Sequence, residues 1–404
     1  MKNLTLLTLK DIEAAQHILK RNVKRTPLTH STTFSKMTNC DVYMKYENLQ
    51  KAGSFKIRGA YNKISNLSQV LRKKGVIAVS TGNHAQGVAL AASMFKIPST
   101  IVMPVGAPIS KIEATKGYGG RVILFGDSFE EASTEAQAIG KREGYSLVHA
   151  FDDPYVIAGQ GTIGLEIFGD LPDVDMVVCP IGGGGLISGI ATAIKAKKPE
   201  CRIIGVQSKV MDAAYRSFKE QKLVHTEKGN TIADGIAIKS PSKLTFSHIV
   251  SLLDDIVLVE EEEIANAMLL LLERCKSVGE GAGAVTLAAL LYRQITKENE
   301  KVVLVVSGGN ADITMLSRII TQGLIKSGRY RELKVLLEDK PGRLESLLSV
   351  ISKEEANVID VSVDRYSPNL PFNFVVVTLA LETKNLDHSL KILKEIQRRF
   401  KVID

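Results

Sequence analysis

Short apolar runs alternate with helical patterns along most of the chain. Segments such as Val76–Val79 are apolar at consecutive positions, which is typical of strands buried on both faces. Between these runs, apolar residues recur three or four positions apart, which is the spacing of helices. The alternation predicts an α/β fold with mostly parallel sheets covered by helices, and ligands bind after the carboxyl ends of such strands. The predicted strands are Val76–Val79, Ser99–Met103, Arg121–Phe125, Met176–Cys179, Ile203–Val206 and Val302–Val306.

The first predicted helix runs from about Leu9 to Val23. Thr8 and Asp11 have the spacing of a capping box, in which two side chains satisfy free backbone N–H groups. Further helices are expected over residues 85–95 and 110–117. The apolar face of the first helix consists of Ile12, Ala15, Ile18 and Leu19.

A second, smaller unit is predicted after a short segment with Gly and Arg. Its order is strand, helix, strand, strand, helix, with a further strand at Val402-Ile403, which is typical of a split-βαβ sandwich with its own core. We therefore expect a first domain over 1–322, a linker over 323–330 and an α+β domain over 331–404. The strands are expected at Leu333–Glu338, Asn357–Arg365 and Asn373–Leu381, and the helices at Arg343–Ser352 and Leu386–Arg399.

The basic charge of the chain does not indicate nucleic-acid binding. The 404 residues carry 52 Lys and Arg against 44 Asp and Glu, a net charge of +8. Residues 331–404 contain 12 of each sign, so the excess is spread thinly over the remainder, without a run of five basic residues. Phosphate backbones require a clustered basic stripe. A diffuse excess suits small anionic ligands instead.

The sequence gives no sign of a metal site, a disulfide framework or a membrane span. The four cysteines stand far apart and lack C-x-x-C spacing. The apolar runs are well short of the ~20 residues that a spanning helix needs. Met1–Leu4 lead into a polar amphipathic segment, not the apolar core of a signal peptide. We expect a cytoplasmic protein with free thiols.

The lysine in Ser54–Gly59 is the first candidate for chemistry. Lysine forms Schiff bases with aldehyde cofactors, and burial lowers its pKa so that the free amine can attack. Lys56 is flanked by Phe55 on one side and by Arg58 and Gly59 on the other. Taken alone, this stretch fits surface charges or a helix start at least as well.

Four consecutive glycines, Gly182–Gly185, follow a predicted strand and open a helix. Such a loop can direct several backbone N–H groups at one anion, and the helix N-terminus adds positive potential. The sequence is neither a P-loop nor a dinucleotide fingerprint, because the required Lys and third Gly are missing. A phosphate cradle is favoured over a plain turn.

Two polar loops follow other predicted strands. Ser80–His84 offers hydroxyls, an amide and N–H groups that suit a carboxylate, although ordinary helix capping explains a single such residue equally well. His84 fits a capping or core histidine better than a proton carrier. Ser307 could face a cofactor or simply begin a turn.

Residues Glu47–Ala60 resemble the pyridoxal-phosphate lysine motif of threonine dehydratases and serine racemases, which are fold-type II enzymes of the tryptophan synthase beta family. Ser80–Gln86, Gly182–Gly185 and Ser307–Asn310 resemble further blocks of that family in order, as do 158–162 and 231–235. The resemblance covers residues ~10–322. It departs at Ala52, where threonine is common, and at 207–215, which leaves a metal site there unsupported.

The resemblance implies a two-lobed catalytic domain, with a small lobe at about 66–147, that binds pyridoxal 5′-phosphate. Lys56 would be the catalytic residue that carries the cofactor and moves the α-proton. Phe55, Asn83 and Ser307 would contact the ring, and Gly182, Gly183, Gly184 and Gly185 would hold the phosphate. Ser80, Thr81, Asn83 and His84 would bind the substrate carboxylate.

The last residues, 331–404, resemble an ACT domain through Asp339–Leu344 and Ala356–Val358. That resemblance implies an amino-acid effector such as isoleucine or valine, bound near Gly342, Leu344 and Asn357. A domain used only for oligomer contacts is the alternative.

Together the two resemblances imply a threonine ammonia-lyase, a homodimer or homotetramer that converts L-threonine to 2-oxobutanoate, and L-serine to pyruvate, in isoleucine biosynthesis or threonine catabolism. Serine racemase or serine dehydratase is one alternative. A catalytically silent amino-acid-binding regulator is another, and a nucleic-acid binder is the weakest.

Overall fold

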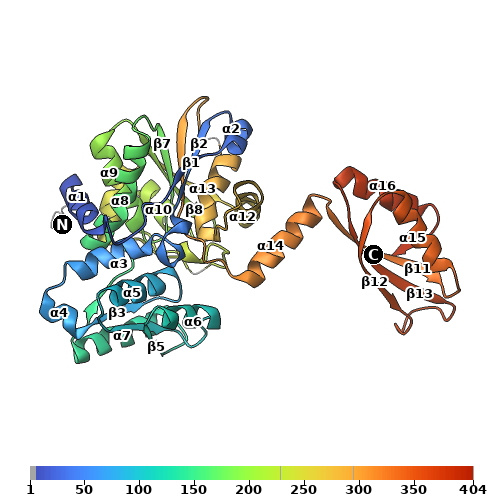
Figure 1. Cartoon of the computed structure of the whole chain (residues 1–404), viewed down its shortest axis with the longest axis horizontal. Helices are drawn as coiled ribbons and strands as arrows, with labels where there is room; N and C mark the ends of the chain where they lie inside the picture. The colour runs from blue at the N-terminus through green and yellow to red at the C-terminus, as the bar shows by residue number, and fades with distance from the viewer. Residues whose placement is uncertain (1–5, 228, 294, 404) are drawn as a thin grey trace. The chain divides into compact units, whose positions relative to one another are not determined.

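The computed structural model describes residues 6–227, 229–293 and 295–403. The chain forms two compact units, residues 1–312 and 313–404 (Figure 1). The division falls before the predicted linker, because helix α14 (Ile313–Lys326) continues through the first residues of 323–330. The predicted linker therefore consists partly of helix.

The larger sheet of the first unit contains six strands in the order β1-β2-β10-β7-β8-β9. All neighbours run parallel except β1, which pairs antiparallel with β2. Helices α8 and α9 lie on one side of this sheet, and α12 and α13 lie on the other (Figure 1). The strands are β1 (Leu28–His30), β2 (Asp41–Tyr46), β7 (Met176–Pro180), β8 (Arg202–Ser208), β9 (Asp255–Val259) and β10 (Lys301–Val306).

The smaller sheet forms a separate lobe with four parallel strands in the order β5-β4-β3-β6. The strands predicted at Val76–Val79 and Ser99–Met103 are confirmed to the residue as β3 and β4. The other two are β5 (Arg121–Leu124) and β6 (Ser146–Leu147), and the helices are α4 (Gln69–Lys74), α5 (Asn83–Met94), α6 (Ile109–Gly117) and α7 (Phe129–Glu143).

The first helix confirms its predicted start but is shorter than predicted. Thr8 and Asp11 form the capping box, and α1 (Leu9–Leu19) ends before the predicted Val23. The remaining helices of the first unit are α2 (Thr32–Thr38), η1 (Glu47–Leu49), η2 (Lys51–Gly53), α3 (Lys56–Ser65), α8 (Pro154–Asp170), α9 (Gly185–Lys197), α10 (Ala213–Glu220), η3 (Asp234–Ile236), α11 (Lys243–Leu252), α12 (Glu261–Cys275) and α13 (Gly281–Tyr292).

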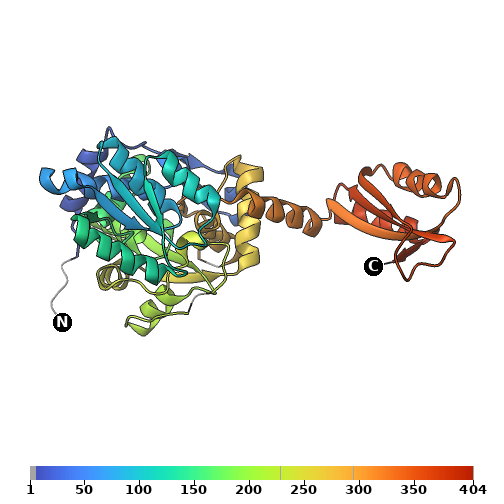
Figure 2. The same cartoon turned by 90° about the horizontal axis from the view of Figure 1, so that it is seen from below.

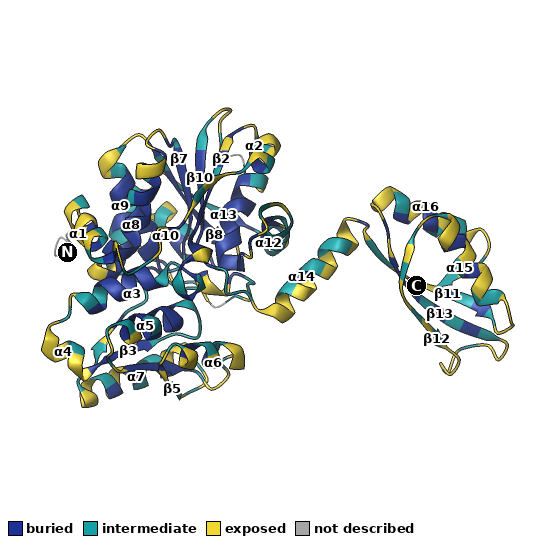
Figure 3. Cartoon of the chain, viewed as in Figure 1, coloured by how far each residue is buried: buried dark blue, intermediate teal, exposed yellow. Residues whose placement is uncertain are grey.

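Apolar burial explains the layers. The strands of both sheets are buried on both faces where helices cover them, and α8, α9 and α13 are buried along most of their length (Figure 3). One apolar cluster joins β7, β8 and β10 to α8 and α9, and another joins α3 and α5 to β3 and β4. The predicted α/β architecture with two mostly parallel sheets is confirmed.

The second unit is an antiparallel sheet of order β12-β13-β11-β14 with two helices, α15 and α16, packed through one apolar cluster (Figure 2). The predicted order of strand, helix, two strands, helix and last strand is confirmed. The elements are β11 (Tyr330–Glu338), α15 (Arg343–Lys353), β12 (Asn357–Asp364), β13 (Phe374–Glu382), α16 (Leu386–Gln397) and β14 (Lys401–Ile403).

Candidate functional site

The predicted site segments meet between the two lobes of the first unit. Strands β7 and β10 are parallel neighbours, so the loops that follow them, with Gly182–Gly185 and Ser307, lie at one edge of the larger sheet. The N–H of Phe55 donates to the carbonyl of Ser307 at 3.1 Å, which brings Lys56 to the same edge. From the small lobe, Asn83 accepts a 2.7 Å hydrogen bond from Asn310.

Lys56 is the first residue of α3 and is partly buried. Nζ donates to the carbonyl of Ala150 at 3.2 Å and lies 5.0 Å from the centroid of the Phe55 ring. Burial lowers the pKa of Lys56 to about 8, against the opposing effect of the carboxyl group of Glu280. An amine with this pKa is partly unprotonated near neutral pH, which is what a nucleophile or a base requires.

The glycine loop leaves no room for side chains. A Cβ on Gly183 would lie 2.2 Å from the Phe151 ring, and one on Gly185 would lie 2.9 Å from Phe151 Cβ. Gly184 has φ +91° at the N-cap of α9, in the left-handed region that favours glycine. The loop is therefore shaped by close packing on one side, while its backbone N–H groups and the N-terminus of α9 remain suited to an anion.

These residues fit pyridoxal phosphate. The glycine loop and the α9 N-terminus suit its phosphate, and the amine of Lys56 suits its aldehyde. The hydroxyl of Ser54, two residues before Lys56, is buried and has no hydrogen-bond partner among the described residues. Ser307 is buried, and its hydroxyl donates to the carbonyl of Ala282 at 3.3 Å.

The Ser80–His84 loop leads into α5, and neither Ser80 nor Asn83 is the N-cap of that helix. The N-cap is Gly82, whose N–H donates to the hydroxyl of Ser80 at 3.1 Å; Thr81 lies in the same turn. His84 is buried, and its Nε2 lies 2.8 Å from the carbonyl of Val148. Burial and the nearby Lys56 lower the pKa of His84 to about 3, so the ring is neutral and cannot offer a positive charge to a carboxylate.

Glu280 is a site residue that the sequence reasoning missed. It lies immediately before α13, and its Oε1 accepts a 2.6 Å hydrogen bond from Nδ2 of Asn83. Burial, with the nearby Asp234, raises the pKa of Glu280 to about 7. Its flanking glycines, Gly279 and Gly281, resemble the other site loops and were the available signal.

The residues predicted to bind an effector do not meet within one chain. Gly342 has φ +82° at the N-cap of α15, in the turn that follows Glu338 at one end of β11. Asn357 pairs with Glu382, which lies opposite Tyr330 at the other end of that strand. Leu344 packs against the apolar cluster of the unit. A single copy of the second unit therefore does not unite Gly342 and Leu344 with Asn357.

The described residues offer neither a metal site nor a membrane-spanning helix. They contain no group of three or more His, Cys, Asp or Glu side chains that could hold a metal ion. Among the helices in this part of the chain, none has both the length and the apolar character needed to cross a membrane.

Known proteins resemble the whole chain. The family model described as "Pyridoxal-phosphate dependent enzyme" matches residues 19–308. An L-threonine ammonia-lyase of Thermotoga maritima is 50% identical over 393 residues, covering 97% of each chain. An L-threonine ammonia-lyase of Geobacter sulfurreducens is 47% identical over 386 residues, covering 96% of each chain.

Solved structures resemble the first unit. Maize serine racemase is 37% identical with a TM-score of 0.75, covering 80% of this chain and 99% of that one. A threonine deaminase of T.th. is 38% identical with a TM-score of 0.73, covering 76% of this chain and 99% of that one.

Proposed function

This chain belongs to the family of pyridoxal-phosphate-dependent enzymes, and from that premise we propose that it deaminates L-threonine to 2-oxobutanoate and ammonia, and L-serine to pyruvate. The observation that carries the proposal is the partly buried amine of Lys56 beside the carboxyl ends of β7 and β10, where Gly182–Gly185 open α9. The relatives named L-threonine ammonia-lyase match along both units, which favours threonine as the main substrate.

The cofactor would be held by residues from both lobes. Lys56 would bind it covalently, Gly182–Gly185 would hold its phosphate, and Phe55, Asn83 and Ser307 would contact its ring. When bound, pyridoxal phosphate supplies an electron-withdrawing ring that takes up the negative charge left by removal of a proton. Ser307 offers a neutral hydroxyl, so no residue at that position forces a proton onto the ring nitrogen.

Lys56 has a second task, which is to move the α-proton of the substrate. Its pKa of about 8 leaves enough free amine near neutral pH to accept that proton. The β-hydroxyl then departs with a proton as water. A second water replaces the nitrogen, which leaves as ammonia, so threonine yields one 2-oxobutanoate and one ammonia.

The substrate carboxylate would bind at the loop before α5. Ser80, Thr81 and Asn83 offer hydroxyl and amide groups there, and the helix N-terminus favours a negative charge. His84 would line the site as a neutral side chain, because its Nε2 is hydrogen-bonded to the carbonyl of Val148.

The direct test is release of 2-oxo acid from threonine and from serine by the purified protein with added pyridoxal phosphate. Lys56→Ala is expected to abolish release and to remove the visible absorbance of the lysine-bound cofactor. Lys73→Ala, a change at an exposed lysine of α4, is the matched control. Wild-type protein that binds the cofactor but releases no 2-oxo acid would support the silent regulator instead.

Serine racemase is a second candidate, because the maize enzyme has the same fold over four-fifths of this chain. It would use the same lysine and glycine loop. Formation of D-serine from L-serine, measured by chiral chromatography, distinguishes the two. D-serine in excess over pyruvate would replace the threonine proposal.

The second unit would regulate the first, in the manner of an ACT domain. Isoleucine or valine would bind near Gly342 and Leu344 of one copy, with Asn357 supplied by another, since one chain does not unite them. This requires a homodimer or homotetramer. Threonine saturation curves with and without isoleucine, for the full chain and for a chain ending before Arg331, test the idea; identical curves would leave the unit with an assembly role.

A cytoplasmic location is part of the same proposal. All four cysteines are free, and Cys40, Cys179 and Cys201 are buried thiols. This is the state expected where thiols are kept reduced. Fractionation of the native host would test it.

A further inference from the structure

Four charged side chains lie together behind the first turn of α3. Lys45, Glu47 and Arg58 are fully buried, and Glu166 is 7% exposed. Arg58 follows Lys56 by two residues, so the two side chains leave the helix about 200° apart, on nearly opposite sides. The amine of Lys56 therefore faces the candidate site, while Arg58 faces away from it.

The guanidinium of Arg58 makes bidentate hydrogen bonds to two carboxylates. Nε and Nη2 donate to the two oxygens of Glu47 at 2.8 and 2.7 Å. Nη1 and Nη2 donate to the two oxygens of Glu166 at 2.7 and 3.0 Å. Nη1 also donates to the hydroxyl of Thr162 at 3.1 Å, and Nη2 to the carbonyl of Lys24 at 3.2 Å.

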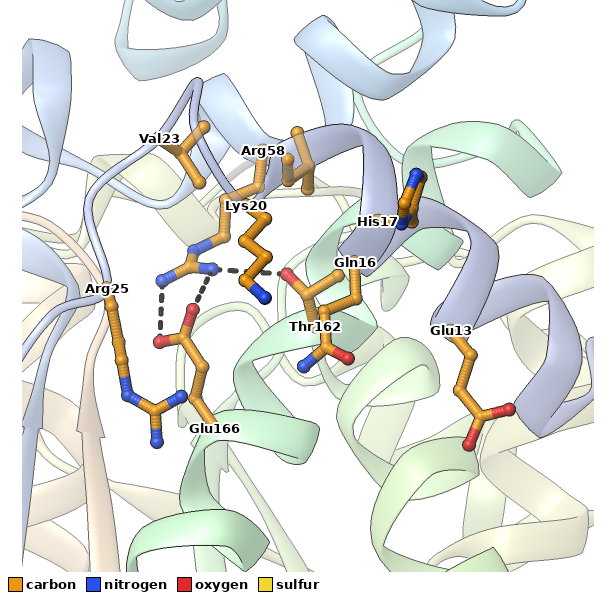
Figure 4. Close-up of a pocket in the computed structure, with 10 residues that line it drawn as sticks. Glu13, Gln16, His17, Lys20, Val23, Arg25, Arg58, Thr162 and Glu166 are labelled. Atoms are coloured by element: carbon orange, nitrogen blue, oxygen red, sulfur yellow. Dashed lines mark hydrogen bonds and ion pairs between the residues drawn. The ribbon is translucent and has the colours of Figure 1, made fainter.

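This group joins α3 to two neighbouring parts of the fold, the end of β2 and helix α8. Glu47 follows β2 in the larger sheet, and Glu166 belongs to α8. Lys45 of β2 donates to Glu166 at 2.6 Å and to the carbonyl of Thr26 at 2.7 Å, so both carboxylates are charge-balanced. Figure 4 shows Arg58, Glu166 and Thr162 connected in this way.

A cavity lies next to Arg58 and Glu166. Both line this cavity of about 550 Å³ between α1, α3 and α8, which Lys20 and Arg25 also border (Figure 4). The guanidinium of Arg58 is nevertheless fully buried, so neighbouring atoms and hydrogen bonds together hold it in place. None of the residues predicted for the cofactor or the substrate lines this cavity.

The start of α3 also lacks the usual means of fixing a helix. Its N-cap, Phe55, makes no side-chain cap. Instead the N–H of Gly59 donates to Oε1 of Gln160 at 3.1 Å. A Cβ on Gly159 would lie 2.6 Å from the carbonyl of Arg58, so the backbones of α3 and α8 touch at this turn. Close contact and the Gly59–Gln160 hydrogen bond fix the distance between the helices, and the four hydrogen bonds of Arg58 to the two carboxylates further restrict the rotation of the turn.

Stability is a poor reason for such a group. Desolvation of buried ion pairs offsets much of their attraction, and well-packed apolar residues often stabilise a protein as well. Arginine differs from lysine in its rigid, planar guanidinium group. This group can donate bidentate hydrogen bonds to two carboxylates only when both lie in its plane. The arrangement therefore specifies an orientation.

We propose that Arg58, held between Glu47 and Glu166, is a positioning residue that sets the rotation of the first turn of α3 and so directs the amine of Lys56 into the site. This inference rests on the proposed role of Lys56 as the cofactor-binding lysine. Arg58 itself touches neither cofactor nor substrate in this role.

Arg58→Lys is the central variant, because it keeps the positive charge but removes the planar guanidinium that makes bidentate hydrogen bonds. Arg293→Lys is the matched control: Arg293 makes a bidentate pair with Glu263 at 2.8 and 2.7 Å, and joins the end of α13 to α12. Arg58→Lys loses two bidentate ion pairs and Arg293→Lys loses one, and only the first variant adjoins Lys56.

Two readouts separate positioning from general weakening. The first is the visible circular dichroism per bound cofactor, which reports how asymmetrically the cofactor is held. The second, in cofactor-free protein, is the pH midpoint for acylation of the Lys56 amine, followed by peptide mass spectrometry. The charged or titratable groups that act on this amine are Glu280, His84 and His149, and neither variant alters them.

Arg58→Lys is expected to bind cofactor at Lys56 with at least twofold weaker circular dichroism, and to shift the acylation midpoint upward as the amine becomes more hydrated. Arg293→Lys should match wild type in both. Wild-type values for Arg58→Lys in both readouts, or equal changes in the control, would overturn the proposal. Wild-type protein that never links cofactor to Lys56 would instead defeat the proposed function, and the acylation result would still decide the role of Arg58.

If Arg58→Lys fails to fold, Glu166→Gln provides the same test, because it keeps the shape and one acceptor oxygen while removing a charge. It is expected to change both readouts in the same direction by a smaller factor. Unchanged values in a folded Glu166→Gln would overturn the proposal equally.

Discussion

Nδ2 of Asn83 donates a 2.6 Å hydrogen bond to Oε1 of Glu280, and so joins the first turn of α5 in the small lobe to the start of α13 beside the larger sheet. Oδ1 of Asn83 accepts from Asn310 at 2.7 Å, so both ends of this amide are used across the lobes. A change of lobe position must break these bonds. Because the pKa of Glu280 is about 7, the protonation state of the carboxyl group in this contact changes near neutral pH.

Glu280→Gln is expected to change the pH dependence of stability. The folded-state pKa of Glu280 lies above its usual value of 4.5, so the stabilising contribution of its proton is complete below pH 4.5 and is lost as pH rises through 7. Relative to wild type, Glu280→Gln should gain up to about 3 kcal/mol between pH 4.5 and 8. Urea unfolding of cofactor-free protein at several pH values measures this difference.

The matched control for that prediction is Glu200→Gln, at an exposed carboxylate. It should show no comparable gain across the same pH range. A constant difference between Glu280→Gln and wild type from pH 4.5 to 8 would mean that Glu280 titrates like an ordinary carboxyl group.

Lys56→Met is expected to stabilise the cofactor-free protein while it destroys activity. The folded-state pKa of Lys56 is about 8 against 10.5 ordinarily, so folding favours the neutral amine. Wild type therefore regains stability between pH 8 and 10.5, and below pH 8 the charged amine costs about 3 kcal/mol. The advantage of Lys56→Met should be largest at pH 7 and shrink toward pH 10, as urea unfolding would show. Lys73→Met, at an exposed lysine, should show no such trend.

Gly183→Ala is expected to weaken both stability and cofactor binding. The new methyl group would lie 2.2 Å from the Phe151 ring, which must move. Overpacking of this kind costs about 1–3 kcal/mol. Thermal unfolding and cofactor titration measure the two effects.

Two companion variants test the cause of that loss. Gly117→Ala should be neutral, since a Cβ there meets nothing within 4 Å. Phe151→Leu should restore part of the stability lost in Gly183→Ala, because it removes the atoms of the clash. A double variant no better than Gly183→Ala would point to backbone geometry instead.

Lys111→Gln is expected to affect substrate use more than stability. Lys111 of α6 pairs with Asp234 at 2.6 Å, and Asp234 acts electrostatically on Glu280. Because Asp234 is 58% exposed, the pair contributes at most about 1 kcal/mol to folding. The pair joins the lobes, however, so its loss should raise the KM for threonine several-fold and remove part of its dependence on salt.

Lys116→Gln is the control for that variant, because Lys116 pairs with Glu113 within α6 and joins no other element. Steady-state kinetics at low and high salt compare the two. Equal changes in KM would mean that loss of surface charge alone, and not the bridge between lobes, explains the effect.

The sequence by itself determined the elements and the identity of the main site loops. The apolar runs at 76–79 and 99–103 became strands, because strands buried on both faces leave a continuous apolar signature that short-range physics suffices to recognise. The Thr8–Asp11 capping box formed because both of its partners lie within one helical turn. The glycine run at 182–185 indicated its own loop, since Gly184 has a left-handed backbone conformation that favours glycine and Gly183 and Gly185 leave no room for a Cβ beside Phe151.

Only the tertiary structure decided which distant residues became neighbours, and with them the chemistry of the site. Burial of Glu280 and its contact with Asn83 join residues far apart in sequence, so the raised pKa of Glu280 has no local signal. The ion pair between Glu166 and Arg58 likewise depends on the packing of α8 against α3. Burial and electrostatic partners set a pKa or an orientation, and both are properties of the assembled fold.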